Sequence, residues 1–243
     1  MHLVGQSAGG HLTALALHAQ AARVAADEDA GGSAAAEGGA AAGAADGAAN
    51  GACALPQHQQ RAHQQKPPLP PPLGASPPWD PRRLRAYAAV SGTYDLEALV
   101  DHLHGRGLYR PLFLDIMAGP DGATGAAALR ALSPTAAAAA LAPAAAAALP
   151  PALLLHGGAD RTVPAAHAAA FAAALRAAGA AARLVVYPGK THTQPIVEDP
   201  MGGGRDELMD EILSLVRGRS CTTRQFAMCP AALIAAASYV SPF

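Results

Sequence analysis

Three short apolar runs, each followed closely by glycine, constrain the fold of this chain more than any other feature. They occupy residues 83–91, 151–156 and 183–187. Apolar residues at successive rather than alternate positions are typical of strands that are buried on both faces. Segments with helical spacing follow, at residues 95–104 and 164–178. Short buried strands that alternate with helices predict a parallel α/β sheet with helices on both sides.

The composition supports one sizeable domain and excludes several classes of protein. The 243 residues are 51% hydrophobic but only 4% aromatic, because alanine dominates, so leucine, valine, isoleucine and tyrosine must form the core. The 17 basic and 18 acidic residues give a net charge of −1, which indicates neither nucleic acid nor an anionic membrane as a partner. The three cysteines show no paired spacing, so we expect no disulfide framework and a reducing compartment.

Low-complexity sequence divides the chain into parts. A helix is expected over residues 11–20, and residues 21–78 then turn rich in alanine and glycine, glutamine and histidine, and finally proline. Such a segment buries too little apolar surface to offset its ordering entropy, and it is predicted to be a disordered insertion. We expect residues 93–149 to form a cap or lid. Residues 219–243 form a tail without an assigned role, and no apolar run is long enough to cross a bilayer.

A serine stands between two glycines near the start of the chain. Residues 2–4 are expected to end a strand, and Gly5-Gln6-Ser7-Ala8-Gly9 leads from there into the first helix. A sharp strand-to-helix turn exposes a serine hydroxyl and requires small neighbours. The backbone N–H of Ala8, at the helix N-terminus, is the expected oxyanion donor. A glycine-rich turn without chemistry explains the motif alone equally well, but the strand–turn–helix context favours Ser7 as a nucleophile.

An acid and a histidine follow the next strands in the order that such a serine requires. Asp160 comes after the strand at residues 151–156, and His192 comes after the strand at residues 183–187. Parallel sheets place their chemistry at the carboxyl ends of the strands. Serine, then aspartate, then histidine is the chain order of α/β-hydrolases. The sequence therefore predicts Ser7 as nucleophile, His192 as general base and Asp160 as the acid that orients the imidazole.

Competing acids and histidines lie at less suitable positions. The histidines are expected in a strand end that faces the core, on the first turn after the nucleophile, or beside an apolar helix. Asp160 has a second role open to it, because a loop acid here can cap the helix that begins near residue 164. No acids, histidines or cysteines have metal-ligand spacing, so neither a metal nor another cofactor is expected. The competing residues are His11, His102, His104, His156, Asp95 and Asp199.

The segments around the three catalytic candidates resemble the plant-type isoprenylcysteine alpha-carbonyl methylesterases. The resemblance rests on LVGQSAGGH, YAAVSGTYDLEALVDHLHGRGLY, LPPALLLHGGADRTVP and YPGKTHTQPIVEDPMGGGRDE. It implies an α/β-hydrolase fold and hydrolysis of the C-terminal methyl ester of a prenylated cysteine, with release of methanol. It also implies association with endoplasmic reticulum and Golgi membranes. An apolar stretch is consistent with either a prenyl pocket or ordinary packing of a cap helix, and its candidate substrate-binding residues are Leu108, Tyr109, Phe113 and Met117.

Two parts of the family pattern have no counterpart in this sequence. They are an upstream His-Gly-Gly-Gly run that supplies oxyanion donors and an N-terminal membrane-spanning region. Ala8 is then the only recognisable oxyanion donor, and loss of one such donor costs about 10²–10³-fold in rate. We expect residues 1–218 to be the C-terminal portion of a hydrolase domain that lacks its N-terminal strands. Two other functions stay open: a broad carboxylesterase or lipase for hydrophobic esters, and a non-catalytic ligand-binding protein.

Overall fold

The four strands of the sheet are parallel and follow one another in chain order. In the computed structural model, β1 (His2–Gln6) pairs with β2 (Ala86–Val90), β2 with β3 (Ala152–Gly157), and β3 with β4 (Ala182–Tyr187). The predicted parallel α/β sheet is therefore confirmed, and β2, β3 and β4 overlap the three apolar runs. The structure describes residues 1–37, 78–117 and 125–240.

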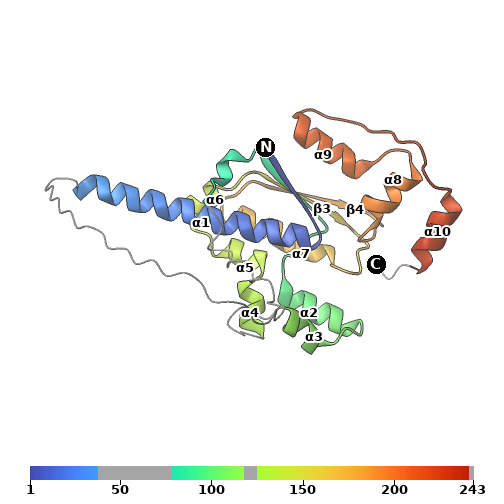
Figure 1. Ribbon diagram of the computed structural model, residues 1–243, viewed down its shortest axis with the longest axis horizontal. Coiled ribbons are helices and arrows are strands. Elements are labelled where there is room, and N and C mark those ends of the chain that lie inside the picture. Colours follow the sequence, from blue (N-terminus) through green and yellow to red (C-terminus); the bar gives the residue numbers. More distant parts are fainter. Residues whose placement is uncertain (38–77, 118–124, 241–243) are drawn as a thin grey trace, which may run out of the picture.

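Every connection between consecutive strands contains helices, because parallel neighbours require a crossover. The helix α1 (Ala8–Glu37) follows β1, and α7 (Ala165–Ala177) links β3 to β4. Figure 1 shows α1 and α7 on one side of the sheet and α9 (Glu207–Arg217) on the other. A 3-10 turn, η2 (Pro81–Arg83), precedes β2. The connection from β2 to β3 contains α2 (Leu96–Gly105), α3 (Arg110–Ile116), α4 (Ala126–Ala131), α5 (Pro134–Ala139) and α6 (Pro143–Ala147).

Both faces of the central strands are buried. Tyr87 and Ala89 of β2 enter one core cluster, while Ala88 and Val90 enter a second one. Helices α1 and α7 contribute to the first cluster, and α9 contributes to the second. This two-sided burial explains why the strands are apolar at successive positions. Other large members are Leu17, Leu154, Phe171 and Leu175 in the first cluster, and Leu153, Leu155, Tyr187 and Leu208 in the second.

The first helix is longer than the expected residues 11–20. It continues to Glu37, so residues 21–37, which were expected to be disordered, are helical. Alanine has the highest intrinsic helix propensity, which favours this continuation. Ala21 and Ala25 also pack against the α6 region, so part of the extension is held by tertiary contacts. The rest of the expected insertion, residues 38–77, lies outside the described residues.

The helices α2, α3 and α4 correspond to much of the segment expected to form a cap. Asp95 begins α2, and its carboxylate accepts a hydrogen bond from the Ala98 backbone N–H at 3.1 Å. In contrast, α3 has no buried residue. A small apolar cluster joins these helices to the loop after β3. Its buried members are Leu96, Leu99, Val100, Leu129 and Val163.

The tail after α9 is bound to the domain rather than detached from it. Gln225 forms an antiparallel bridge with Gly204, and the Thr223 hydroxyl donates to Asp210 Oδ1 at 2.7 Å. The last helix, α10 (Ala231–Val240), contacts α8 (Asp199–Gly202), which follows a π-helical turn, η3 (Gln194–Glu198). The tail therefore packs near the segment after β4. Within the described ranges, no helix has both the length and the apolar character needed to span a membrane.

Candidate active site

Ser7 occupies a strained turn between β1 and α1. Its φ angle is +50°, and its backbone N–H donates to the Val90 carbonyl at 2.9 Å, which extends the β1–β2 ladder into the turn. A residue with a side chain in this conformation costs about 1–3 kcal/mol, and it persists where the surroundings fix it. A Cβ at Gly5 would collide with the Gly9 carbonyl and the Thr13 hydroxyl, whereas a Cβ at Gly9 meets no atom within 4 Å. Packing therefore requires glycine before Ser7, but it does not require glycine after it.

The structure brings the three catalytic candidates together in one hydrogen-bonded chain. His192 Nε2 lies 3.0 Å from Ser7 Oγ, and His192 Nδ1 lies 2.7 Å from Asp160 Oδ2. An ionised carboxylate only accepts, so Nδ1 carries the proton and Nε2 is free to accept from the Ser7 hydroxyl. His192 is 5% exposed and Asp160 is 7% exposed. This arrangement allows His192 to remove the Ser7 proton while Asp160 stabilises the resulting imidazolium.

Asp160 is buried but remains a carboxylate. Burial opposes its ionisation, but hydrogen bonds from His156, His192 and the Val163 backbone outweigh that effect and hold the pKa of Asp160 well below its ordinary value. The backbone N–H groups of Thr162 and Val163 donate to Oδ1 at 2.9 and 2.8 Å. The loop thus supplies the donors that replace water around the charge.

The loops that carry Asp160 and His192 are joined through their backbones. Ala159 N donates to the Lys190 carbonyl at 2.9 Å, and Gly158 N donates to the Tyr187 carbonyl at 2.8 Å. A Cβ at Gly157 would collide with the carbonyl oxygens of Lys190 and Thr191, so the close approach of the loops requires glycine there. The two loops therefore form one rigid unit, which fixes the distance between acid and base.

The region that contains Asp160 and His192 matches a known family of serine hydrolases. Residues 80–208 match the model of the prolyl oligopeptidase family. The chain belongs to the prolyl oligopeptidase family. Ser7 lies outside the matched region, so its place in the site rests on the geometry above.

Two relatives of this prolyl oligopeptidase-family chain are named for the same activity. A probable isoprenylcysteine alpha-carbonyl methylesterase of Oryza sativa subsp. japonica is 37% identical over 147 residues, which cover 60% of this chain and 34% of the relative. The isoprenylcysteine alpha-carbonyl methylesterase of Arabidopsis thaliana is 37% identical over 179 residues, which cover 70% and 40%. The chain spans well under half of either relative. Among solved structures, an acylaminoacyl peptidase in complex with a chloromethyl ketone aligns at 15% identity and a TM-score of 0.41, covering 63% of this chain and 22% of that one.

The competing residues have other partners in this family member. His11 Nε2 is 2.7 Å from the Leu132 carbonyl oxygen, and His102 Nε2 is 2.7 Å from the Arg161 carbonyl oxygen. Asp95 caps α2, and Asp199 pairs with Lys190 at 2.6 Å. None of these four contacts involves the Ser7–His192–Asp160 chain. The helix-capping alternative for Asp160 also fails, because α7 begins at Ala165, after the N-cap Pro164, and no side chain caps it.

Sequence reasoning missed the contact between His156 and the acid. His156 faces the interior, as expected, but its Nε2 lies 3.2 Å from Asp160 Oδ2. The signal that could have found it is the spacing of the two residues, i and i+4 across a glycine turn. Ala8 is the first residue of α1, so its backbone N–H has no acceptor within the helix, consistent with the predicted oxyanion role.

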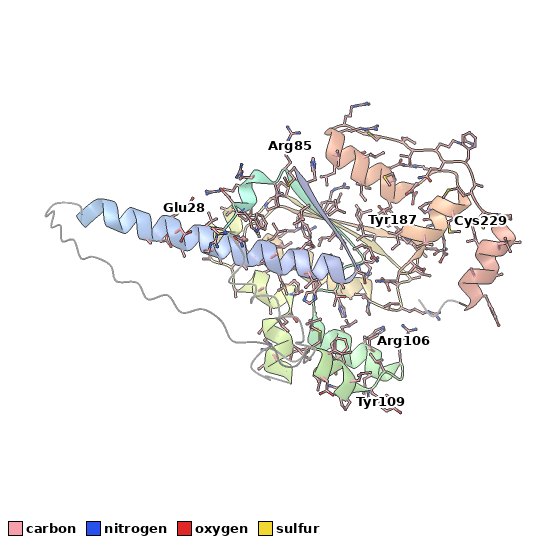
Figure 2. All side chains as sticks on the ribbon, in the orientation of Figure 1. Glu28, Arg85, Arg106, Tyr109, Tyr187 and Cys229 are labelled. Carbon is pink, nitrogen blue, oxygen red and sulfur yellow. The ribbon has the colours of Figure 1, made fainter. Side chains whose placement is uncertain are left out.

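The four residues expected to bind substrate lie in α3 or beside its ends, within the segment expected to form a cap. Leu108 and Tyr109 are exposed, Tyr109 to 77%, whereas Phe113 and Met117 pack partly buried against the cap cluster. Figure 2 shows Tyr109 with the cap helices, well separated from Tyr187 at the sheet. No hydrogen bond or core cluster of the described residues joins these four side chains to the triad. Their role in substrate binding stays a prediction.

An apolar groove lies beside the segment that follows His192. Its volume is about 430 Å³, and Thr193, the next residue in the chain, contributes to its wall. Helix α10 forms the opposite wall, so the groove depends on the docked tail. Within the described ranges, no acids, histidines and cysteines gather into a group that could hold a metal ion. The other lining residues are Val197, Glu198, Met201, Cys229, Leu233, Ile234 and Ala237.

Proposed function

We propose that this chain is a serine esterase in which Ser7 is the nucleophile, His192 the general base and acid, and Asp160 the orienting carboxylate. The observation that carries the proposal is the continuous hydrogen-bonded chain from Ser7 Oγ through His192 to Asp160 Oδ2, at 3.0 and 2.7 Å. A serine hydroxyl becomes a useful nucleophile only when a base is within hydrogen-bond reach. The positive φ of Ser7, at the end of a parallel strand, gives the same support.

The geometry supports a two-step hydrolysis. Ser7 Oγ attacks the ester carbonyl carbon while its proton passes to His192 Nε2. The tetrahedral intermediate, with its oxyanion facing the Ala8 N–H, expels the alkoxide, which takes that proton and leaves as an alcohol. A water molecule then gives a proton to His192 and attacks the acyl-Ser7 ester. Collapse of the second intermediate returns the proton to Ser7 Oγ and releases the carboxylic acid.

We further propose the C-terminal methyl ester of a prenylated cysteine as the substrate, so that the alcohol released is methanol. Support comes from the two plant methylesterases that are 37% identical to this chain and from the GRGLY and GKTHT segments. The apolar groove beside Thr193 is compatible with a hydrophobic ester. Endoplasmic reticulum and Golgi membranes, which the resemblance to the methylesterase family implies, are the proposed place of action, and a prenyl group would partition into their lipid.

Methanol release from farnesylcysteine methyl ester tests the substrate proposal. The full chain is expected to release methanol, and the Ser7→Ala variant is expected to release none above the uncatalysed rate. Hydrolysis of simple acyl esters without methanol release from the prenylcysteine ester contradicts the substrate and supports a broad carboxylesterase or lipase instead. The exposed apolar residues around α3 are compatible with either candidate, because they do not distinguish a prenyl chain from an acyl chain.

A fluorophosphonate probe separates an enzyme from a ligand-binding protein. The probe reacts with an activated serine, so labelling of the full chain and its loss in Ser7→Ala are expected. Glu97, which is paired with Arg130 on the cap, offers a matched control, and Glu97→Gln is expected to keep full labelling. A folded chain that binds a prenylcysteine ester but is not labelled contradicts the esterase proposal.

A further inference from the structure

His156 is a buried histidine that the triad mechanism leaves without a role. It lies near the end of β3, is 1% exposed, and precedes Asp160 by four residues. Its Nε2 is 2.8 Å from the Val163 carbonyl oxygen and 3.2 Å from Asp160 Oδ2. Both neighbours of this nitrogen are therefore oxygen acceptors on the loop that carries the acid.

The surroundings of the ring fix its tautomer. The Val163 carbonyl can only accept a hydrogen bond, so Nε2 carries the proton. Nδ1 is buried and has no hydrogen-bond partner, so a second proton there would be left without an acceptor. His156 is therefore a neutral Nε2–H donor, shared between the carbonyl of Val163 and the carboxylate of Asp160.

One oxygen of the acid consequently faces two imidazoles. Asp160 Oδ2 accepts from His192 Nδ1 at 2.7 Å and is approached by His156 Nε2 from another side, while Oδ1 is taken by two backbone N–H groups. The carboxylate can rotate neither toward nor away from His192 without breaking one of these bonds. A donor on Oδ2 also withdraws part of the negative charge that attracts the His192 imidazolium.

We propose that His156 is a positioning residue of the esterase site, which holds Asp160 Oδ2 in line with His192 Nδ1 and moderates the strength of that acid–base pair. This inference rests on the proposed function of Ser7, His192 and Asp160. It assigns His156 no contact with substrate, and it separates two effects: alignment of the carboxylate and control of the pH at which His192 is neutral.

Other ionisable groups in the neighbourhood belong to several elements. His167 of α7 is buried, which lowers its pKa, and Asp95, His102, His156 and Asp160 all act on it electrostatically. His102 of α2 is 2.7 Å from the Arg161 carbonyl oxygen. Only His156 and His192 have a ring nitrogen within bonding distance of the Asp160 carboxylate among the described residues. A change in pH dependence that follows substitution of His156 is therefore attributable to the shared oxygen.

The test measures the rate of fluorophosphonate labelling against pH in the full chain and three variants. His156→Gln keeps an N–H near the position of Nε2, whereas His156→Leu and His156→Phe remove it. In the donor-free variants the maximal rate is expected to fall about 10-fold, the order expected for loss of one hydrogen bond to a charged group. The acidic limb is expected to move to higher pH, because the unshared carboxylate holds the His192 imidazolium more strongly. His156→Gln is expected to restore the limb and most of the rate.

A control variant and a measurement on the unmodified chain complete the test. His18→Leu removes another buried histidine, on α1, and is expected to leave the acidic limb in place. Nitrogen chemical shifts of the unmodified chain are expected to show His156 as the neutral Nε2–H tautomer across the active pH range. A charged or Nδ1–H form, or a donor-free variant with an unmoved limb and an undiminished rate, overturns the proposal. The probe needs no prenyl substrate, so failure to release methanol from farnesylcysteine methyl ester contradicts only the substrate proposal.

Discussion

The loop after β3 carries a predicted catalytic residue, and the region of helix α3 carries predicted substrate-binding residues. The two regions differ in how firmly their side chains are held. Asp160 lies in a loop where backbone and imidazole donors surround one carboxylate. The α3 helix has no buried residue: Phe113 packs partly buried on a small apolar cluster, and Tyr109, which precedes the helix, is exposed. The proposed chemical step therefore depends on side chains that several hydrogen bonds fix at the carboxyl edge of the sheet. The predicted binding of substrate around α3 depends instead on a surface helix without a buried residue.

The largest expected effect is on kcat, and it tests the hydrogen-bonded residues at the carboxyl edge of the sheet directly. His192→Ala is expected to lower kcat for ester hydrolysis by about 10⁵–10⁶-fold, and Asp160→Asn by about 10⁴-fold, because the base is lost or its tautomer is wrong. Asp199→Asn removes the partner of Lys190 in the same region and serves as the control, with an expected loss below about 5-fold. Steady-state kinetics measures kcat, and thermal unfolding shows whether each variant is folded. Near-normal turnover in a folded Asp160→Asn variant means that the acid is misassigned.

The next effect tests how tightly the two loops must fit. Gly157→Ala forces the carbonyls of Lys190 and Thr191 away from the β3 loop, which displaces His192. A displacement near 1 Å costs about 10²-fold in kcat. Gly105→Ala places the same methyl group where no atom lies within 4 Å, and it is expected to leave kcat unchanged. Equal kcat for the two variants contradicts the rigid-unit interpretation.

A smaller effect is expected on the cap, and it is expected in KM rather than in kcat. If the cap contacts a long apolar chain, Tyr109→Ala raises KM for farnesylcysteine methyl ester by about 3- to 10-fold, because one apolar contact is lost. The KM for a short acetyl ester is expected to stay the same. Thermal stability is also expected to be unchanged, since Tyr109 is 77% exposed. Identical KM values for both esters in the variant and the parent exclude Tyr109 from substrate binding.

The smallest effect is on the free energy of unfolding, and it concerns His18, a buried histidine outside the hydrogen-bonded site. Burial lowers the pKa of His18 from 6.5 to about 4. Below pH 6.5 the unfolded chain binds a proton that the folded chain excludes, so the free energy of unfolding falls as the pH drops toward 4. The loss amounts to roughly 3 kcal/mol at most. His18→Phe cannot take up that proton, so denaturant unfolding at pH 7 and pH 4.5 is expected to show a smaller acid loss than in the parent.

Much of the candidate site could be predicted, because the position of each triad residue relative to its strand can be read from nearby sequence. Each triad residue comes shortly after a predicted strand, and parallel strands bring such positions to one edge of the sheet. The contact of His156 with Asp160 was missed because burial alone indicated a core histidine. The direction of its ring depends on the path of the loop after Gly157, which no local pattern encodes.

The extent of the helix α1 and the course of the tail show the same limit. An alanine-rich segment is consistent with a helix or with disorder, and contacts of Ala21 and Ala25 with the α6 region help to determine the outcome. The tail after Gly218 has no periodicity that assigns it, and it is held by Thr223 and Gln225 through partners on and before α9.

The sequence by itself determined the parallel sheet and the order of the three catalytic candidates, because these follow from periodicity and from position along the chain. Only the tertiary structure decided that His192 reaches both Ser7 and Asp160, and that His156 shares the Asp160 carboxylate. Those outcomes depend on distances between segments far apart in the chain, which are set by how the sheet and loops pack.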